Sequence, residues 1–131
     1  FEDCTSLKNV VMGENVSTIK MSAFYNCSSL SSIHIPASTL DIDKAAFLGC
    51  TGLGQITVAD GNERYDSRDG CNAIIRKGEF KNLKEVGATL ELGCKNTTIP
   101  TDTSFEIVED GITKEYVNSV DTLDGPIYGI T

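Results

Sequence analysis

Residues 23–36 read AFYNCSSLSSIHIP, and residues 46–59 read AFLGCTGLGQITVA. Residues 1–13, FEDCTSLKNVVMG, carry the same pattern a third time. Corresponding residues lie 23 positions apart, in five columns: Phe1, Phe24 and Phe47; Cys4, Cys27 and Cys50; Leu7, Leu30 and Leu53; Val10, Ile33 and Ile56; Met12, Ile35 and Val58. Two shorter columns, Ile19 with Ile42 and Ala23 with Ala46, lie in the connecting part of the unit. A fixed period of this length is typical of repeat proteins, in which each unit packs on its neighbours.

Each unit contains a short strand signal and a short turn signal. The Leu-x-x-Ile-x-Ile ending alternates apolar and polar residues, which predicts a strand with one face inward. Residues 19–24 and 42–47, IKMSAF and IDKAAF, hold better helix formers and predict a single helical or 3₁₀ turn. A unit of this size cannot bury its own core, so we expect the units to stack and their strands to pair. The sequence therefore predicts a solenoid.

The composition fits one soluble domain and argues against some classes of binding partner. The chain has 131 residues, of which 40% are hydrophobic, and its net charge is −8. Residues 101–131 hold seven acids and only Lys114, so most of the negative charge lies there. This balance argues against nucleic acids and anionic membranes as partners. No apolar run reaches the ~20 residues that cross a bilayer.

The start of the chain also carries an expectation. FEDCTSLKNV lacks the basic and apolar regions of a signal peptide, and the chain opens in the middle of a repeat unit. We therefore expect it to be a piece of a longer protein, whose targeting this piece does not reveal.

The repeated AFxxCxxLxxIxIP pattern resembles the BspA-like leucine-rich repeats, the 23-residue class of surface and secreted bacterial proteins. The resemblance covers residues 1–100, with a wide coil at about residues 59–98 that includes VADGNERYDSRDGCNAII and LGCKNTTIP. It implies an α/β but strand-dominated solenoid: a right-handed leucine-rich-repeat superhelix with short helical turns and a divergent C-terminal cap. It also implies a non-catalytic interaction or adhesion module at a bacterial cell surface, or secreted, that binds host matrix proteins or other cells.

Residues 101–131 depart from the repeat pattern. FEIVEDGITKEYV has apolar alternation on both sides of Asp110-Gly111, a dipeptide favoured in tight hairpin turns. Asp124-Gly125-Pro126 predicts a second turn. We read this segment as a divergent last coil or hairpin cap covering the open end of the solenoid, and the start of a second domain is the alternative.

The cysteines are expected to be structural. Cys4, Cys27 and Cys50 form an inward column whose spacing a disulfide would tolerate, but buried free thiols are the favoured interpretation. Whether Cys71 and Cys94 pair is left open. One histidine and no C-x-x-C motif argue against zinc, and the spacing of Asp60, Asn62, Asp66 and Asp69 does not fit a calcium loop. We predict no metal and no cofactor.

No catalytic residues are predicted. His34 is the only histidine, and its position between two inward isoleucines points it to the opposite face from the cysteine column. A glycan-acting enzyme would need a pair of carboxylates at a fixed separation, and no such pair recurs in the units.

The resemblance suggests a binding face instead, because the outward residues of stacked strands commonly meet ligands in leucine-rich repeats. Here this face comprises Asn9, Val11, Ser32, His34, Gln55 and Thr57. The set is polar, uncharged and without an aromatic anchor, so we expect weak or multivalent contacts with a protein or glycoprotein. A structural spacer that displays another domain is the alternative. We also expect self-association through the exposed N-terminal coil, and no membrane insertion.

Overall fold

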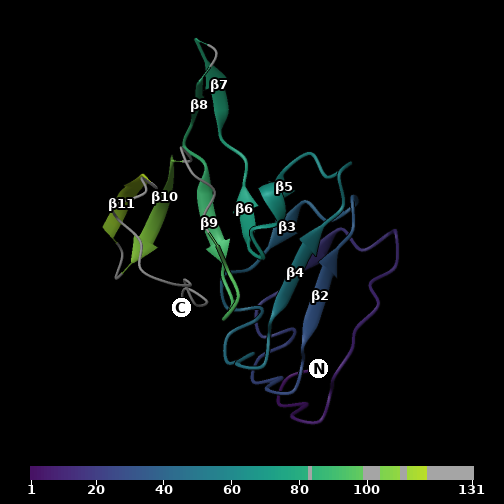
Figure 1. The fold of residues 1–131 in the computed structure, drawn as a ribbon. Coiled ribbons are helices and arrows are strands. Elements are labelled where there is room, and N and C mark those ends of the chain that lie inside the picture. The colour runs from purple at the N-terminus through teal and green to yellow at the C-terminus, as the bar shows by residue number, and fades with distance from the viewer. Residues whose placement is uncertain (83, 99–103, 110–111, 118–131) are drawn as a thin grey trace.

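A computed structural model gives the fold, and it describes residues 1–82, 84–98, 104–109 and 112–117 (Figure 1). Short strands dominate, and the described residues contain one helix, the three-residue 3₁₀ helix η1. In chain order the elements are β1 Thr18–Ile19, β2 Ser32–Ile35, β3 Asp41–Ile42, β4 Gln55–Val58, β5 Tyr65–Asp66, η1 Arg68–Gly70, β6 Ile74–Arg76, β7 Glu79–Lys81, β8 Lys84–Val86, β9 Thr89–Leu92, β10 Ser104–Glu109 and β11 Ile112–Val117.

The repeat units stack in the register that the sequence predicts. β1 pairs with β3 in parallel, with Ile19 opposite Ile42, and β2 pairs with β4 in parallel, with Ile33 opposite Ile56. Each pair joins residues 23 positions apart. The period in the sequence is therefore the backbone register of the fold.

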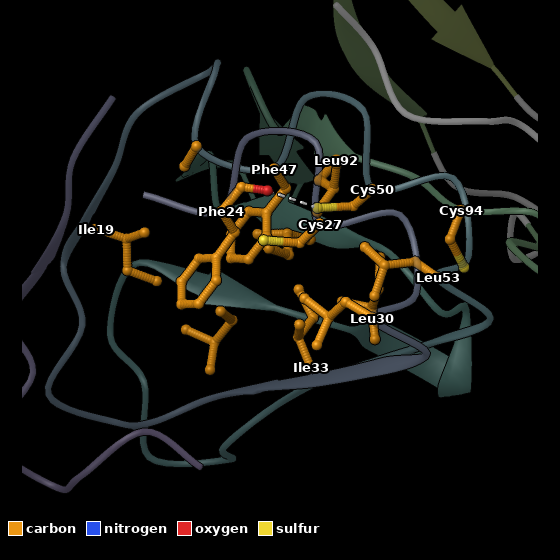
Figure 2. Packing of buried hydrophobic residues seen from close by; sticks show 14 of the residues in the cluster. Ile19, Phe24, Cys27, Leu30, Ile33, Phe47, Cys50, Leu53, Leu92 and Cys94 are labelled. Carbon is orange, nitrogen blue, oxygen red and sulfur yellow. Dashed lines mark hydrogen bonds between the residues drawn. The ribbon is translucent and has the colours of Figure 1, made fainter. Parts of the chain in front are cut away.

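The repeated apolar columns form the core (Figure 2). Leu30, Ile35 and Ile56 are fully buried, and Phe24 and Phe47 are nearly so. The Phe24 ring stacks on Phe47 with centroids 5.2 Å apart, and Phe1 stacks on Phe24 at 5.6 Å. A side chain in one unit thus packs on its own counterpart in the next, which is how units too small for separate cores share one.

The predicted helical turns are instead isolated hydrogen-bonded turns. Within residues 19–24 the Ala23 N–H donates to the Lys20 carbonyl at 3.1 Å, and within residues 42–47 the Ala46 N–H donates to the Asp43 carbonyl at 3.0 Å. Asn26, just after the first of these turns, has φ +57°, a left-handed conformation that stops helical propagation. The same conformation recurs every 23 residues, at Asp3, Asn26, Gly49 and Asn72. These residue types tolerate positive φ best, so the column defines the turn.

The first unit is less regular than the next two. Residues 7–12 match the strand signal but form no strand, and the Ser31 N–H donates to the Lys8 carbonyl at 3.2 Å beside them. Leu7, Val10 and Met12 are only partly buried. In this structure the unit packs against the second unit alone, so its inward residues keep more contact with solvent.

The region after β4 leaves the simple stack. β5, β6 and β9 join β10 and β11 in a five-stranded sheet of order β11-β10-β9-β6-β5, while β7 and β8 form a separate hairpin. The Ile56 N–H of β4 meets Asn72 Oδ1 at 3.4 Å, and the Ile56 carbonyl accepts from the Ser67 hydroxyl at 3.1 Å. Side chains therefore take the positions that another repeat strand would occupy. For this reason, the described residues do not form the continuous right-handed superhelix that was expected.

β10 and β11 pair antiparallel, with Glu109 opposite Ile112, and Glu106 of β10 pairs in parallel with Thr89 of β9. Strands thus lie on both sides of Asp110-Gly111, as the sequence predicted. Asp110-Gly111 and Asp124-Gly125-Pro126 fall outside the described residues, and the role of residues 101–131 as a cap stays a prediction.

Candidate binding faces

The β2–β4 pair brings four of the six expected face residues together. The register places Ser32 opposite Gln55 and His34 opposite Thr57. His34 and Gln55 are exposed, and Ser32 and Thr57 are half-buried. His34 Nδ1 lies 2.8 Å from the Thr57 hydroxyl, so this hydrogen bond links the two units on their solvent side. The four side chains form two short polar rows across the pair.

Asn9 and Val11 extend this face less directly. Both are exposed, Val11 by 97%, but they lie in the segment of the first unit that has no strand. No pairing register therefore aligns them with Ser32 and His34. Whether any of the six residues binds a ligand remains a prediction.

Cys27 and Cys50 of the cysteine column are buried and follow one hydrogen-bond geometry, and Cys4 is half-buried. The Cys27 thiol donates to the Phe1 carbonyl at 3.1 Å, and the Cys50 thiol donates to the Phe24 carbonyl at 3.0 Å. All five cysteines are free, Cys71 and Cys94 included. Burial raises the pKa of Cys50 from 9.0 to about 11 and also raises the pKa of Cys27. A thiol of this kind is a poor nucleophile, because the thiolate is the reactive form.

Two of the four loop residues considered for calcium, Asn62 and Asp66, bind other groups of the chain. Asn62 is 1% exposed, its side-chain amide donates to the carbonyls of Pro36 and Thr39 at 2.9 and 2.7 Å, and its Oδ1 accepts from the Tyr65 N–H at 2.8 Å. The Asp66 carboxylate accepts hydrogen bonds from the Arg68 guanidinium. In the part of the chain that the structure describes, no group of three or more His, Cys, Asp or Glu residues could hold a metal.

Asn62 belongs to a column that the sequence analysis missed. Val16, Thr39 and Asn62 lie 23 residues apart, and the two polar side chains each donate to the backbone carbonyl one unit earlier: the Thr39 hydroxyl to Val16 at 2.6 Å, and the Asn62 amide to Thr39 at 2.7 Å. Tyr65 likewise follows Ile42, whose N–H donates to the Tyr65 hydroxyl at 3.1 Å. The period therefore continues into the wide coil, to Tyr65 in these contacts and to Asn72 in the left-handed column, and a count in steps of 23 would have found it.

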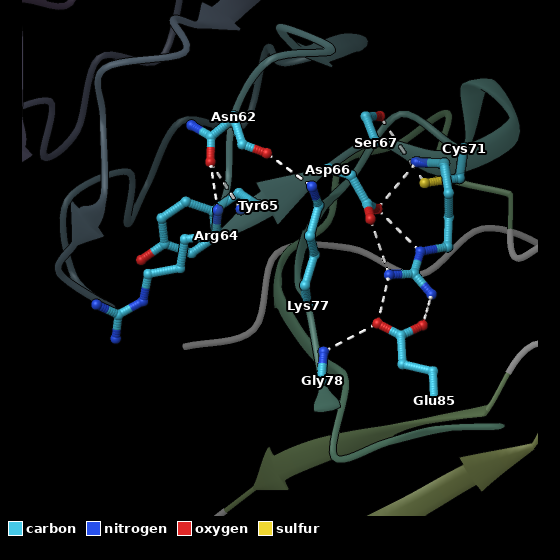
Figure 3. A network of polar contacts seen from close by, with 10 residues as sticks. Asn62, Arg64, Tyr65, Asp66, Ser67, Cys71, Lys77, Gly78 and Glu85 are labelled. Atoms are coloured by element: carbon cyan, nitrogen blue, oxygen red, sulfur yellow. Dashed lines mark hydrogen bonds and ion pairs between the residues drawn. The ribbon is translucent and has the colours of Figure 1, made fainter. Parts of the chain in front are cut away.

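An ion-pair network around Arg68 was also not predicted from the sequence (Figure 3). The Arg68 guanidinium donates to the carboxylate of Glu85 at 2.6 and 3.2 Å, and to that of Asp66 at 2.8 and 2.9 Å. These side chains are 18–28% exposed. The hydrogen bonds from Arg68 lower the pKa of Glu85 below its ordinary value of 4.5. Arg68 and Glu85 lie 17 residues apart, outside any repeat spacing, so no sequence pattern joins them.

The β7–β8 hairpin carries exposed apolar side chains. Phe80 is 77% exposed and Val86 47%. Glu85 holds the base of the hairpin, because its carboxylate also accepts from the Gly78 N–H at 2.9 Å. We call β7 and β8, Glu79–Lys81 and Lys84–Val86, the arm.

Comparison with known families adds one match. A family model described as the BspA type leucine rich repeat region matches residues 1–98, in six copies. Searches of curated proteins and of solved structures find no match. Among the described residues there is no helix with the length and hydropathy of a membrane span.

Proposed function

The chain belongs to the BspA-type leucine-rich repeat family, and from this premise we propose that it is an adhesion module whose contact face is the outward side of the β2–β4 pair. The family suggests a repeat module for protein interaction, is generally non-enzymatic, and is typically found at the cell surface or secreted. The finer proposal is that this module serves a bacterial surface or secreted protein and binds host matrix proteins or other cells.

One observation carries the proposal: β2 and β4 pair in the repeat register, so exposed residues of successive units stand side by side. His34 and Gln55 are exposed on this face, and the hydrogen bond between His34 Nδ1 and the Thr57 hydroxyl joins the two rows at 2.8 Å. The buried columns behind the strands give the face a rigid support. A rigid row of small polar groups suits several weak contacts, which gain strength from repetition.

The residue types on this face indicate how strongly it should bind. The face carries no Trp, Tyr or Arg, the side chains that most often dominate binding energy. We therefore expect the described units alone to bind weakly, and a longer array to bind through avidity. We also propose that such an array forms a solenoid, as the repeat period predicts, with the right hand that the family resemblance implies.

The experiment compares binding of the chain to immobilised host matrix glycoproteins and mucins with that of His34→Ala/Gln55→Ala/Thr57→Ala. We expect saturable binding that the triple variant loses by about tenfold or more, since each group contributes a fraction of the contact. The matched control is Thr18→Ala/Asp41→Ala/Lys44→Ala, three exposed positions on or beside the β1–β3 pair, and we expect it to bind like the wild type.

The alternative function is a structural spacer that displays another domain and has no ligand of its own. The uncharged, anchor-free character of the outward rows favours it. Folded wild-type protein that binds none of the immobilised proteins would overturn the adhesion proposal in favour of this alternative. Equal losses in both triple variants would instead place the contact away from the β2–β4 face.

A further inference from the structure

The β7 edge of the arm can accept a further strand. The arm projects from the rest of the molecule (Figure 1), and within the described ranges β7 pairs with β8 alone. Lys81 lies opposite Lys84 with two residues between them, so this pair makes the closing hydrogen bonds of the hairpin. Hydrogen-bonded and non-hydrogen-bonded pairs alternate along antiparallel strands. The N–H and carbonyl of the next residue, Phe80, therefore point away from β8.

The side chains of β7 are exposed as well. Phe80 is 77% exposed, and the side chains of Glu79 and Lys81 are 83% and 66% exposed. Glu79 and Lys81 form a loose ion pair, with 3.9 Å between the carboxylate and Nζ. A hairpin without further strands or a covering layer is only marginally stable in water, so an added strand would stabilise the arm.

The sequence of β7, Glu79–Lys81, is complementary to itself when two copies run antiparallel. With Phe80 opposite Phe80, the outward N–H and carbonyl groups of the two residues meet, and the rings form a favourable cross-strand pair. Glu79 of each copy then lies opposite Lys81 of the other. A shift by one residue would mismatch the hydrogen-bonding groups, and a shift by two would place like charges opposite each other. Only the register centred on Phe80 satisfies both requirements.

The base of the arm is fixed in place (Figure 3). Glu85 of β8 binds Arg68 of η1 through two hydrogen bonds, and Arg68 is held in turn by Asp66. Gly78 lies so close to β8 that a Cβ there would stand 2.2 Å from the Val86 carbonyl oxygen. An arm that is anchored before binding loses less conformational entropy when it docks.

We propose that the arm is a self-association element, in which β7 pairs antiparallel with β7 of a second copy of the chain about a two-fold axis at Phe80. The product is a four-stranded sheet of order β8-β7-β7-β8, to which each copy contributes the same edge. The paired strands are short, so the dimer is weak and gains strength where copies are held close together. The contact uses neither the β2–β4 face nor the first repeat unit, so it goes beyond the proposed adhesion function.

Disulfide trapping in the full chain tests the pairing and its register. Phe80→Cys places two thiols across a hydrogen-bonded pair, where the Cα atoms lie about 5.5 Å apart, within the range of a disulfide. We expect this variant to form a covalent dimer under mild oxidation. Glu79→Cys alone should not, because Glu79 lies opposite Lys81, whereas a mixture of Glu79→Cys and Lys81→Cys should form the mixed dimer. The wild type, with its own five free cysteines, gives the background.

Sedimentation velocity over a concentration series measures the dimer without a cross-link. Phe80→Ser is expected to weaken it by about fivefold or more, through loss of the aromatic pair and its burial. Lys81→Glu is expected to weaken it by placing two acids opposite each other. Adding Glu79→Lys to that variant should restore the dimer, because the exchanged charges are again complementary. Circular dichroism of each variant checks the fold.

The matched controls are Met21→Ser and Met21→Cys, at an apolar position of similar exposure, 70%, in the first unit. Both should behave like the wild type. A chain that stays monomeric at every concentration would overturn the proposal, and so would equal trapping of Glu79→Cys alone and of Phe80→Cys, which indicates random collision. A dimer lost in Met21→Ser but kept in Phe80→Ser would overturn it too, by assigning the contact to the first unit.

Discussion

Residues 1–58 and residues 59–98 are held together in different ways. In the first region the same contacts recur every 23 residues: apolar columns, a thiol-to-carbonyl column and parallel strand pairs. In the second region the main polar contacts beyond Tyr65 occur once each, as in the ion pairs of Arg68 with Glu85 and of Arg76 with Glu91. The first region is thus stabilised mostly by repetition of apolar packing, and the second also by individual charged pairs.

The cost of a substitution is therefore expected to differ between the two regions. A column residue contacts its counterparts in the neighbouring units. Truncating it therefore removes packing contacts with the unit before it and the unit after it. A charged pair in the second region stabilises a single contact between two segments. Its contribution to the free energy of unfolding depends on pH.

The largest effect is expected in the apolar columns. Leu30→Ala removes a side chain that is fully buried between two other units, so we expect the free energy of unfolding to fall by about 2–5 kcal/mol through lost burial and a residual cavity. Urea unfolding measures it. Leu40→Ala, at a position that is 42% exposed, is the control and should cost less than about 1 kcal/mol. Equal losses at the two positions would contradict the importance of the column.

A smaller and pH-dependent effect is expected at the ion-pair network. Arg68→Met leaves two carboxylates without their cation, and we expect a loss of about 1–3 kcal/mol at neutral pH, less than for a fully buried pair because solvent reaches the site. The pKa of Glu85 is lowered in the folded state, so its contribution is present above about pH 4.5 and disappears as the pH falls through the lowered value.

Urea unfolding of the wild type and of Arg68→Met from pH 7 to pH 3 measures both quantities. The difference in stability between the two proteins should shrink as the pH falls. Arg76→Met is the control, since the Arg76 side chain is 42% exposed beside Glu91 and should contribute less. A difference that stays constant with pH would show that the network does not stabilise through charge.

The smallest effect is expected in the thiol column. Cys50→Ala removes one hydrogen bond and a small volume, for a loss of about 1 kcal/mol at pH 7. The pKa of Cys50 is raised from 9.0 to about 11 in the folded state. Its contribution is therefore present below pH 9 and is lost as the pH rises toward 11, because the unfolded thiol ionises first.

Unfolding at pH 7 and pH 10 tests this: the wild type should lose more stability over that interval than Cys50→Ala does. Cys4→Ala, at the half-buried first position of the column, serves as the control with a smaller loss at pH 7. An identical pH response in the wild type and in Cys50→Ala would show that the protonated Cys50 thiol does not stabilise the folded state.

Much of the regular region could be predicted from the sequence, because the repeat period alone determines which residues pack on one another. The period of 23 predicts which residues share a column, and the burial of Phe24, Leu30 and Ile33 confirms that these columns point inward. The same alternation predicts that His34 and Gln55 lie on the outward side, and they are exposed there. That these residues bind a partner remains a prediction, because the period describes packing and carries no information on ligands.

The rest depends on conformations and contacts that the period does not encode. The turns predicted at residues 19–24 and 42–47 do not extend into helices, because Asn26 and its column, just beyond them, adopt positive φ, a preference visible in the residue types only once the turn is known. The superhelix was expected to continue, but the side chains of Asn72 and Ser67 occupy the edge of β4. Arg68 and Glu85 meet through the path of the intervening chain, which local patterns do not fix.

The left-handed column at Asp3, Asn26, Gly49 and Asn72 bears on how such a chain can change during evolution. Gain or loss of a whole repeat by recombination within the gene keeps every later residue in its own column. A single inserted codon instead moves all later residues by one place, so an ordinary side chain would have to adopt a conformation that suits glycine, asparagine or aspartate. Arrays of this kind should therefore vary in length among strains by complete units.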